Sequence, residues 1–109
     1  MEHMNMISIA RDFSVTPGPR LIVEGDFSGE AFRETLLKPR FEKSLEKKEK
    51  LVVDLDGTVG YGTSFLEEAF GGLARTYGSD SVMNTIDIIS NEEPYLKDDV
   101  SDYILKAND

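Results

Sequence analysis

Hydrophobic and polar positions follow two different periods along the chain, and the changes of period mark the predicted elements. Alternating or continuous apolar residues predict four strands, at 6–13, 20–25, 51–55 and 82–90. Apolar residues three and four positions apart predict three helices, at 28–49, 64–78 and 91–107. Two prolines around Gly18 predict a turn between the first two strands, which would then form a hairpin.

The predicted order is β-β-α-β-α-β-α, which indicates an α/β domain with a mixed sheet. The later strands would be parallel across helical connections, and the N-terminal hairpin would be antiparallel. The nearly continuous apolar run at 51–55 is typical of a central strand covered on both faces. A chain of 109 residues holds one core. We therefore expect residues 1–109 to form a single domain, with residues 1–5 disordered.

Three local signals refine the predicted helices. Ser28 is the expected N-cap of the first helix, and Pro39 should end or kink it. Ser64 and Glu67 have the spacing of a capping box at the start of the second helix. The glycines at 71–72 lie inside that helix, where each costs about 1 kcal/mol relative to alanine. We expect close packing on a strand or on another chain to offset this cost.

Composition narrows the class of partner. The chain has 21 acidic and 12 basic residues, and its formal net charge of −9 repels nucleic acid and anionic lipid. It contains no cysteine, which excludes disulfides and zinc–thiolate sites. No apolar run approaches the roughly 20 residues that span a bilayer. We expect a cytoplasmic protein that binds neither nucleic acid nor membranes and carries no metal or other cofactor.

The motif Asp-Leu-Asp-Gly-Thr at 54–58 resembles the nucleophile motif of haloacid-dehalogenase-type phosphotransferases. On an extended chain Asp54 and Asp56 point to the same side, where one could attack a phosphoryl group and the other serve as acid or base beside Mg²⁺. The pattern supplies no lysine or further acids from other strand ends, so this Mg²⁺-dependent phosphatase remains an alternative. The competing interpretation is that an aspartate accepts hydrogen bonds from turn amides before Gly57.

Two longer segments resemble the STAS domains, the fold of the bacterial anti-sigma-factor antagonists, and especially a bacterial STAS-like family. They are EGDFSGEAFRETLLKPRFEK at 24–43 and LVVDLDGTVGYGTSFLEEAFGGLAR at 51–75. In STAS domains a strand ending in Asp-Leu-Ser-Gly leads to Asp-Ser-Ser-Gly at a helix start, and Asp54, Leu55 and Gly57 match the first part. The resemblance implies a non-enzymatic regulatory module that binds a protein, such as a GHKL-type ATPase or kinase or an anti-sigma factor.

By the same resemblance, Thr63 stands at the STAS phosphoacceptor position and Ser64 on the hydroxyl residue after it. Phosphorylation adds roughly −1.5 to −2 charges at a helix start and changes which surface docks there. The alternative role of both hydroxyls is N-capping. Gly60 and Gly62 permit a positive φ, and Tyr61 between them is either an exposed interface anchor or a side chain packed over the loop. These five residues form the predicted partner-binding switch segment.

A third hypothesis is a small nucleotide- or anion-binding site at the same glycine-rich loop. The loop has neither a following lysine nor the Gly-x-Gly-x-x-Gly order that such sites use. The oligomeric state stays open, because the chain could be a monomer or pair through an exposed strand edge.

Overall fold

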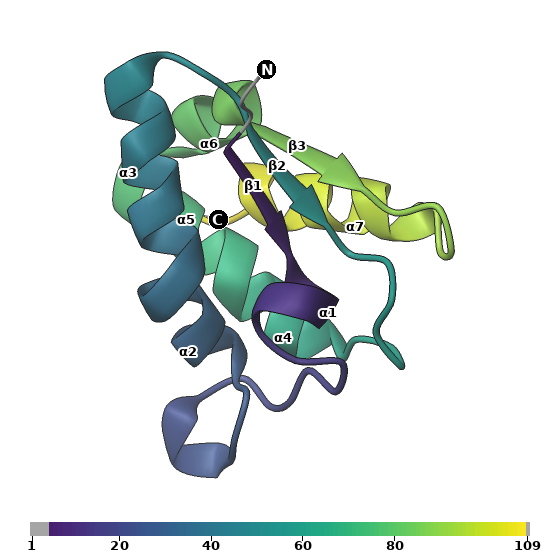
Figure 1. The fold of residues 1–109 in the computed structure, drawn as a ribbon. Helices are drawn as coiled ribbons and strands as arrows, with labels where there is room; N and C mark the ends of the chain where they lie inside the picture. The colour runs from purple at the N-terminus through teal and green to yellow at the C-terminus, as the bar shows by residue number, and fades with distance from the viewer. Residues whose placement is uncertain (1–4, 109) are drawn as a thin grey trace.

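Three short parallel strands form the sheet, and they lie side by side in the order in which they follow along the chain (Figure 1). The computed structural model describes residues 5–108. The strands are β1 (Asn5–Ser8), β2 (Leu51–Asp54) and β3 (Ile86–Ile89). Because β2 lies in the middle, it pairs with both of the other strands.

The connections between the strands are helical. After β1 come α1 (Ile9–Asp12) and a 3₁₀ turn, η1 (Ile22–Glu24). The first crossover continues with α2 (Gly29–Phe32), the π turn η2 (Arg33–Leu37) and α3 (Lys38–Lys47). The second contains α4 (Thr63–Leu66), the π turn η3 (Glu67–Gly71), α5 (Gly72–Tyr77) and α6 (Ser79–Thr85). The helix α7 (Tyr95–Leu105) follows β3.

The predicted N-terminal hairpin is wrong, and the sheet is wholly parallel rather than mixed. Residues 20–25 form no strand. They belong to a loop that contains η1, and Val23 in this loop is 89% exposed. Leu21 is extended, and the 3₁₀ turn that begins at Ile22 interrupts the extended course. β1 is also shorter than predicted, because Ser8 ends it and caps α1 by accepting a hydrogen bond from the Arg11 amide.

The predicted last strand began too early. Val82 and Thr85 are both buried at helical spacing in α6, and strand alternation starts only at Ile86 and Ile88. An apolar run of this length is compatible with a helix or a strand. Its first half, residues 82–85, forms the end of α6, and its second half forms β3. The α/β class with helices between successive strands is confirmed.

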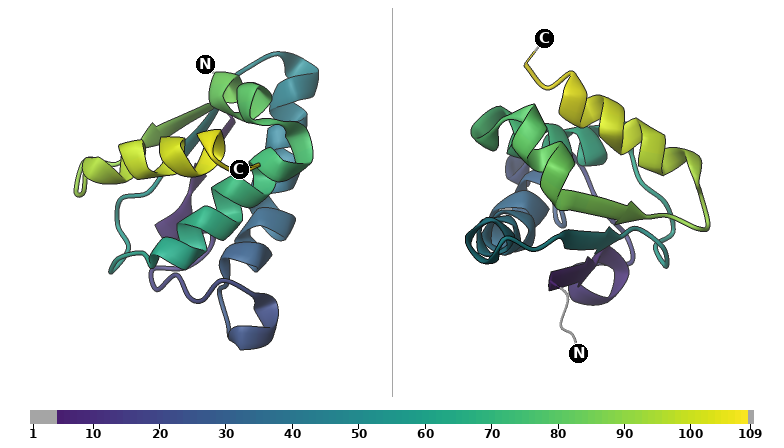
Figure 2. Two further views of the ribbon diagram at one scale, coloured as in Figure 1. Left: turned by 180° about the vertical axis from the view of Figure 1, so that it is seen from behind. Right: turned by 90° about the horizontal axis from the view of Figure 1, so that it is seen from above.

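Two long helices pack on one face of the sheet only (Figure 2). The first consists of α2, η2 and α3, and the second consists of α4, η3 and α5. Strands placed in chain order, with right-handed crossovers, carry both helical connections to the same side. Burial alternates accordingly: Leu51 and Val53 are buried under the helices, whereas Val52 and Asp54 on the opposite face are only partly buried. The prediction that β2 is covered on both faces is therefore wrong.

The first long helix accommodates its proline without a break. Ser28 is its N-cap as predicted, and its Oγ accepts a hydrogen bond from the Ala31 amide at 2.9 Å. Pro39 has no N–H to donate to the preceding turn, and the π turn η2 lies immediately before it. The expected end or kink is thus a local widening of a helix that continues to Lys47.

The start of the described chain is well anchored. Asn5, which we expected to be disordered, is buried in β1, and its Nδ2 donates to the Arg40 carbonyl at 2.7 Å and to Ser44 Oγ at 2.8 Å. Residues 1–4, the rest of that prediction, lie outside the described residues. Within 5–108 no helix has the length and apolar character needed to cross a bilayer.

Candidate functional site

The two aspartates of the 54–58 motif organise the loop that follows β2. Asp54 Oδ1 accepts a hydrogen bond from the Asp56 amide at 2.9 Å. The Asp56 carboxylate reaches the loop after β3 and accepts from the amides of Asn91 and Glu92, each at 2.9 Å. These bonds, the Glu92 amide first, lower the pKa of Asp56. Asp54 therefore does what the turn interpretation of the motif predicts, whereas Asp56 joins this turn to the loop after β3.

The phosphotransferase interpretation requires more than this pair. Asp54 does lie at the carboxyl end of the central strand, where such a nucleophile belongs. Among residues 5–108, however, neither Asp54 nor Asp56 forms an ion pair, and no three acidic or histidine side chains are grouped to hold a metal ion. The geometry gives the aspartates a structural role, and catalysis by them stays an untested prediction.

Neighbouring segments hold the loop after β2 on both sides. Gly57 donates its amide to Glu92 Oε1 at 2.8 Å on the β3 side. Val59 donates its amide to the Val15 carbonyl at 2.8 Å on the β1 side. Gly57 has a φ of 95°, a conformation that favours glycine at the turn. The loop is therefore part of an ordered edge of the molecule, at the carboxyl ends of the three strands.

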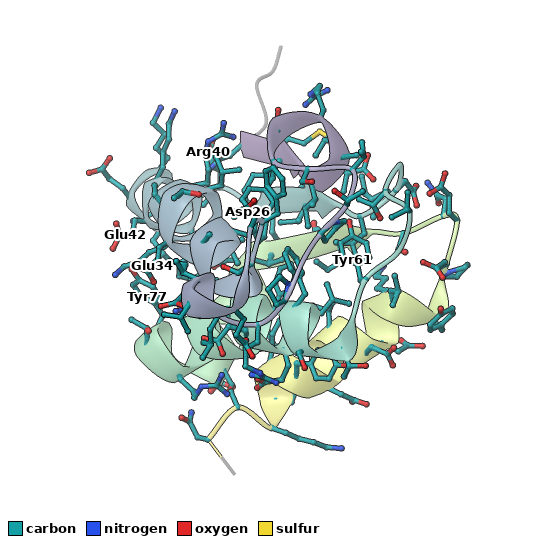
Figure 3. The ribbon with its side chains drawn as sticks, turned by 90° about the horizontal axis from the view of Figure 1, so that it is seen from below. Asp26, Glu34, Arg40, Glu42, Tyr61 and Tyr77 are labelled. Atoms are coloured by element: carbon teal, nitrogen blue, oxygen red, sulfur yellow. The ribbon has the colours of Figure 1, made fainter. Side chains whose placement is uncertain are left out.

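Tyr61 packs over this loop, which is the second of the two roles predicted for it (Figure 3). Its hydroxyl donates to the Leu55 carbonyl at 2.8 Å, and its ring centroid lies 5.8 Å from that of Phe65. Burial raises the pKa of Tyr61 to about 12. The ring thus closes the loop onto the start of α4, and its hydroxyl is committed to the backbone.

The hydroxyls of Thr63 and Ser64 are exposed and do not cap the helix. The N-cap is Gly62, with φ −78° and ψ 150° and no side-chain hydrogen bond, so Thr63 and Ser64 are the first two helical residues. The predicted capping box of Ser64 with Glu67 is wrong, because Glu67 pairs with arginines. Gly60 adopts a positive φ of 141°, and Gly62 does not.

Sequence reasoning missed an ionic network one turn beyond Ser64. Glu67 accepts from Arg20 at 2.6 Å and from Arg75 at 2.8 Å, and Glu68 accepts from Arg33 at 2.6 Å and from Arg20 at 3.1 Å. Arg75 and then Arg20 lower the pKa of Glu67. The partners come from the loop before α2, the first long helix and the second, and no local spacing reveals such a set. The adjacent acids in an apolar helix were the only available signal.

This network explains the two helical glycines. A Cβ at Gly72 would lie 2.4 Å from Arg33 Nη1, and a Cβ at Gly71 would lie 2.5 Å from Glu67 Oε2. The π turn η3 also leaves the Glu68 carbonyl able to accept a second bond from Arg33, at 2.7 Å. The glycines therefore admit side chains of this same chain instead of the strand that we expected, and packing on another chain stays a prediction.

The model of one protein family matches most of the chain. The family is described as a STAS-like domain of unknown function (DUF4325), and the match covers residues 28–96. This segment runs from the N-cap of α2 to the first turn of α7 and includes the switch segment 60–64. No curated protein and no solved structure gave a match.

Proposed function

The chain belongs to the STAS-like domain family, and we propose on this basis that it is a non-enzymatic regulatory module that binds a protein. Its role would be similar to that of an anti-sigma-factor antagonist, with a GHKL-type ATPase or kinase or an anti-sigma factor as partner. One observation carries the proposal: Thr63 and Ser64 present two exposed hydroxyls, neither used for capping, at a helix start whose next two residues, Phe65 and Leu66, are buried.

Phosphorylation of either hydroxyl would switch this surface. The positive end of the helix dipole tolerates a phosphate at the first turn, so the fold should survive the modification. A phosphate on Ser64 would lie three and four residues before Glu67 and Glu68, on the same side of the helix. Those two carboxylates are already paired with arginines, so the phosphate would add an exposed negative charge that they do not supply, and it would repel a partner that presents acidic groups there.

The test starts with a search of the neighbouring genes for a GHKL-type ATPase or kinase, and continues with calorimetric binding of that protein to the Thr63→Glu and Ser64→Glu variants. Thr76→Glu is the matched control, because Thr76 is also exposed but lies at the other end of the same long helix. We expect at least a tenfold loss of affinity for the first two variants and none for the control, with unchanged melting temperatures. Equal binding by all three variants would contradict the proposal.

The phosphatase alternative keeps one supporting observation, the position of Asp54 at the end of the central parallel strand. It predicts Mg²⁺-dependent release of phosphate from p-nitrophenyl phosphate by the purified protein. Asp54→Asn should abolish that release, and a preparation without it would dismiss the alternative. The hypothesis of an anion site gains no support, since residues 55–62 contain no lysine or arginine.

A further inference from the structure

The loop 18–27, where we expected a strand, has a defined structure. Three backbone hydrogen bonds tie its base: Gly18 N to Phe27 O at 2.8 Å, Gly29 N to Pro19 O at 2.9 Å, and Glu30 N to Arg20 O at 3.0 Å. The side chain of Arg20 also bonds Glu67 and Glu68 in the second long helix. The loop is therefore fixed to the body of the domain from both its backbone and its side chains.

The tip of this loop carries apolar side chains into solvent. Val23 is 89% exposed and Ile22 is 55% exposed. Two carboxylates satisfy the backbone beneath them: Glu24 Oε1 accepts from the Leu21 amide at 2.8 Å, and Glu30 Oε1 accepts from the Ile22 amide at 2.9 Å. The backbone amides of Leu21 and Ile22 are thus satisfied by Glu24 of the turn and Glu30 of α2, while the side chains of Ile22 and Val23 are exposed.

The loop keeps this shape at a conformational cost. The cost lies at Phe27, which is not a glycine and yet has a φ of 57°. Gly18 permits the close approach at the base of the loop, because a Cβ there would lie 2.2 Å from the Asp26 carbonyl oxygen. Backbone strain of this kind persists where the surroundings enforce it and is concentrated at binding sites. A loop already held in one conformation loses little entropy when a partner binds.

More exposed apolar side chains lie along the carboxyl edge of the sheet and at the base of the loop. Val59 is 80% exposed and its amide bonds the carbonyl of the exposed Val15, while the exposed Phe27 packs edge-on against Phe13. Figure 3 views the molecule from this edge. Loop 18–27 also carries two exposed acids, Glu24 and Asp26. Neither takes part in an ion pair among residues 5–108.

We propose that loop 18–27 is a docking element that inserts Ile22 and Val23 into an apolar pocket, bordered by lysine or arginine, on a protein partner. Charge complementarity selects this occupant. A second copy would bring the same acids of two chains, each of net charge −9, against one another, and an anionic membrane would meet the same repulsion. This surface lies outside the switch segment, so the inference goes beyond the proposed function.

Designed peptides can test the loop without knowledge of the natural partner. The probes are two amphipathic helical peptides of equal length and leucine content, one with lysine and the other with glutamate at the polar positions. Titration of the ¹⁵N-labelled full chain should show the leucine–lysine peptide shifting the amides of 18–27, and the leucine–glutamate peptide should leave them unchanged. The double variant Ile22→Ser/Val23→Ser should weaken binding at least tenfold.

Leu105→Ser is the matched control, because Leu105 is 54% exposed on α7, close to the value for Ile22. It should retain the parent affinity within twofold. Thr63→Glu should also leave the peptide affinity unchanged, which separates this inference from the proposed function. Glu24→Lys/Asp26→Lys should transfer the preference to the leucine–glutamate peptide.

Four results would overturn the inference. The first is a set of amide shifts that spreads over the acidic surface without loop 18–27, and the second is an equal loss of affinity in the Leu105→Ser control. The third is a dimer, seen by sedimentation, that the double serine variant dissociates, which would make a second copy the occupant. The fourth is binding to phosphatidylcholine vesicles that the same variant abolishes, which would make the occupant a lipid surface.

Discussion

Replacing Gly72 with alanine sets two opposing free energies against each other. Alanine favours a helix by about 1 kcal/mol relative to glycine, and Gly72 lies at the start of α5 within a long helix. The added Cβ would stand 2.4 Å from Arg33 Nη1, the atom that donates both to the Glu68 carbonyl and to its carboxylate. The guanidinium must move, and its nearly buried position leaves it little room.

The magnitude follows from what the guanidinium loses. A hydrogen bond to a charged group contributes about 1.5–3 kcal/mol, and displacement of Nη1 removes roughly one of its two. Subtracting the gain in helix propensity, Gly72→Ala should lower the free energy of unfolding by about 0.5–2 kcal/mol. Urea denaturation followed by circular dichroism measures this change, with a constant m-value as the check that only stability has altered.

A double-mutant cycle isolates the contact. In an Arg33→Met background the guanidinium is absent, so the same Gly72→Ala change should become stabilising by about 1 kcal/mol. The change of sign between the two backgrounds is the expected result. An alanine that stabilises the parent chain as much as the Arg33→Met chain would refute the argument that Arg33 is the reason for this glycine.

Three further predictions concern the loops at the carboxyl edge. Asp56→Asn should lower the melting temperature at neutral pH: the folded pKa of Asp56 is lowered, so its contribution is present above its unfolded pKa of about 3.9 and is lost as the pH falls through the folded pKa. Between about pH 5 and pH 2, the melting temperature should therefore depend less on pH in this variant than in the parent chain. An equal pH dependence in both chains would contradict the prediction. Tyr61→Phe removes the donor to the Leu55 carbonyl and should cost about 0.5–1.5 kcal/mol in urea denaturation, whereas no loss would mean that water replaces the bond. Arg20→Ala should speed amide hydrogen exchange in loop 18–27 and leave exchange in β2 unchanged; equal protection of the loop in both chains would show that its backbone bonds suffice.

The two long helices and the turn chemistry after β2 were predictable because their signals are local. Helical spacing of apolar residues, the Ser28 cap and the bond from the Asp56 amide to Asp54 each act within a few positions. The loop 18–27, where a hairpin strand was expected, was not predictable in the same way. The apolar residues at 21–23 look alike whether they pair in a sheet or form an exposed tip, and only distant partners such as Glu67 and Glu68 decide between the two.

The candidate site shows the same division. The family resemblance correctly indicated a STAS-like domain, and it drew attention to residues 60–64. It did not reveal that Gly62 is the N-cap and that Ser64 stays exposed. The spacing of Ser64 and Glu67 had instead predicted a capping box. Glu67 forms ion pairs with arginines at positions 20 and 75. Sequence spacing does not reveal that such distant residues compete with Ser64 for the Glu67 side chain.

The central place of β2 also has a kinetic consequence. Asn5 pairs with Leu51, and Leu51 pairs with Ile86, so each ladder forms only after a complete helical crossover has brought its ends together. Closing such loops is entropically unfavourable before any contact compensates, and parallel pairing is therefore slow relative to helix formation. In the described sheet, β1 and β3 each pair with β2 alone. The arrival of β2 should thus limit the folding rate, and until it is paired the apolar LVV segment remains available for aggregation.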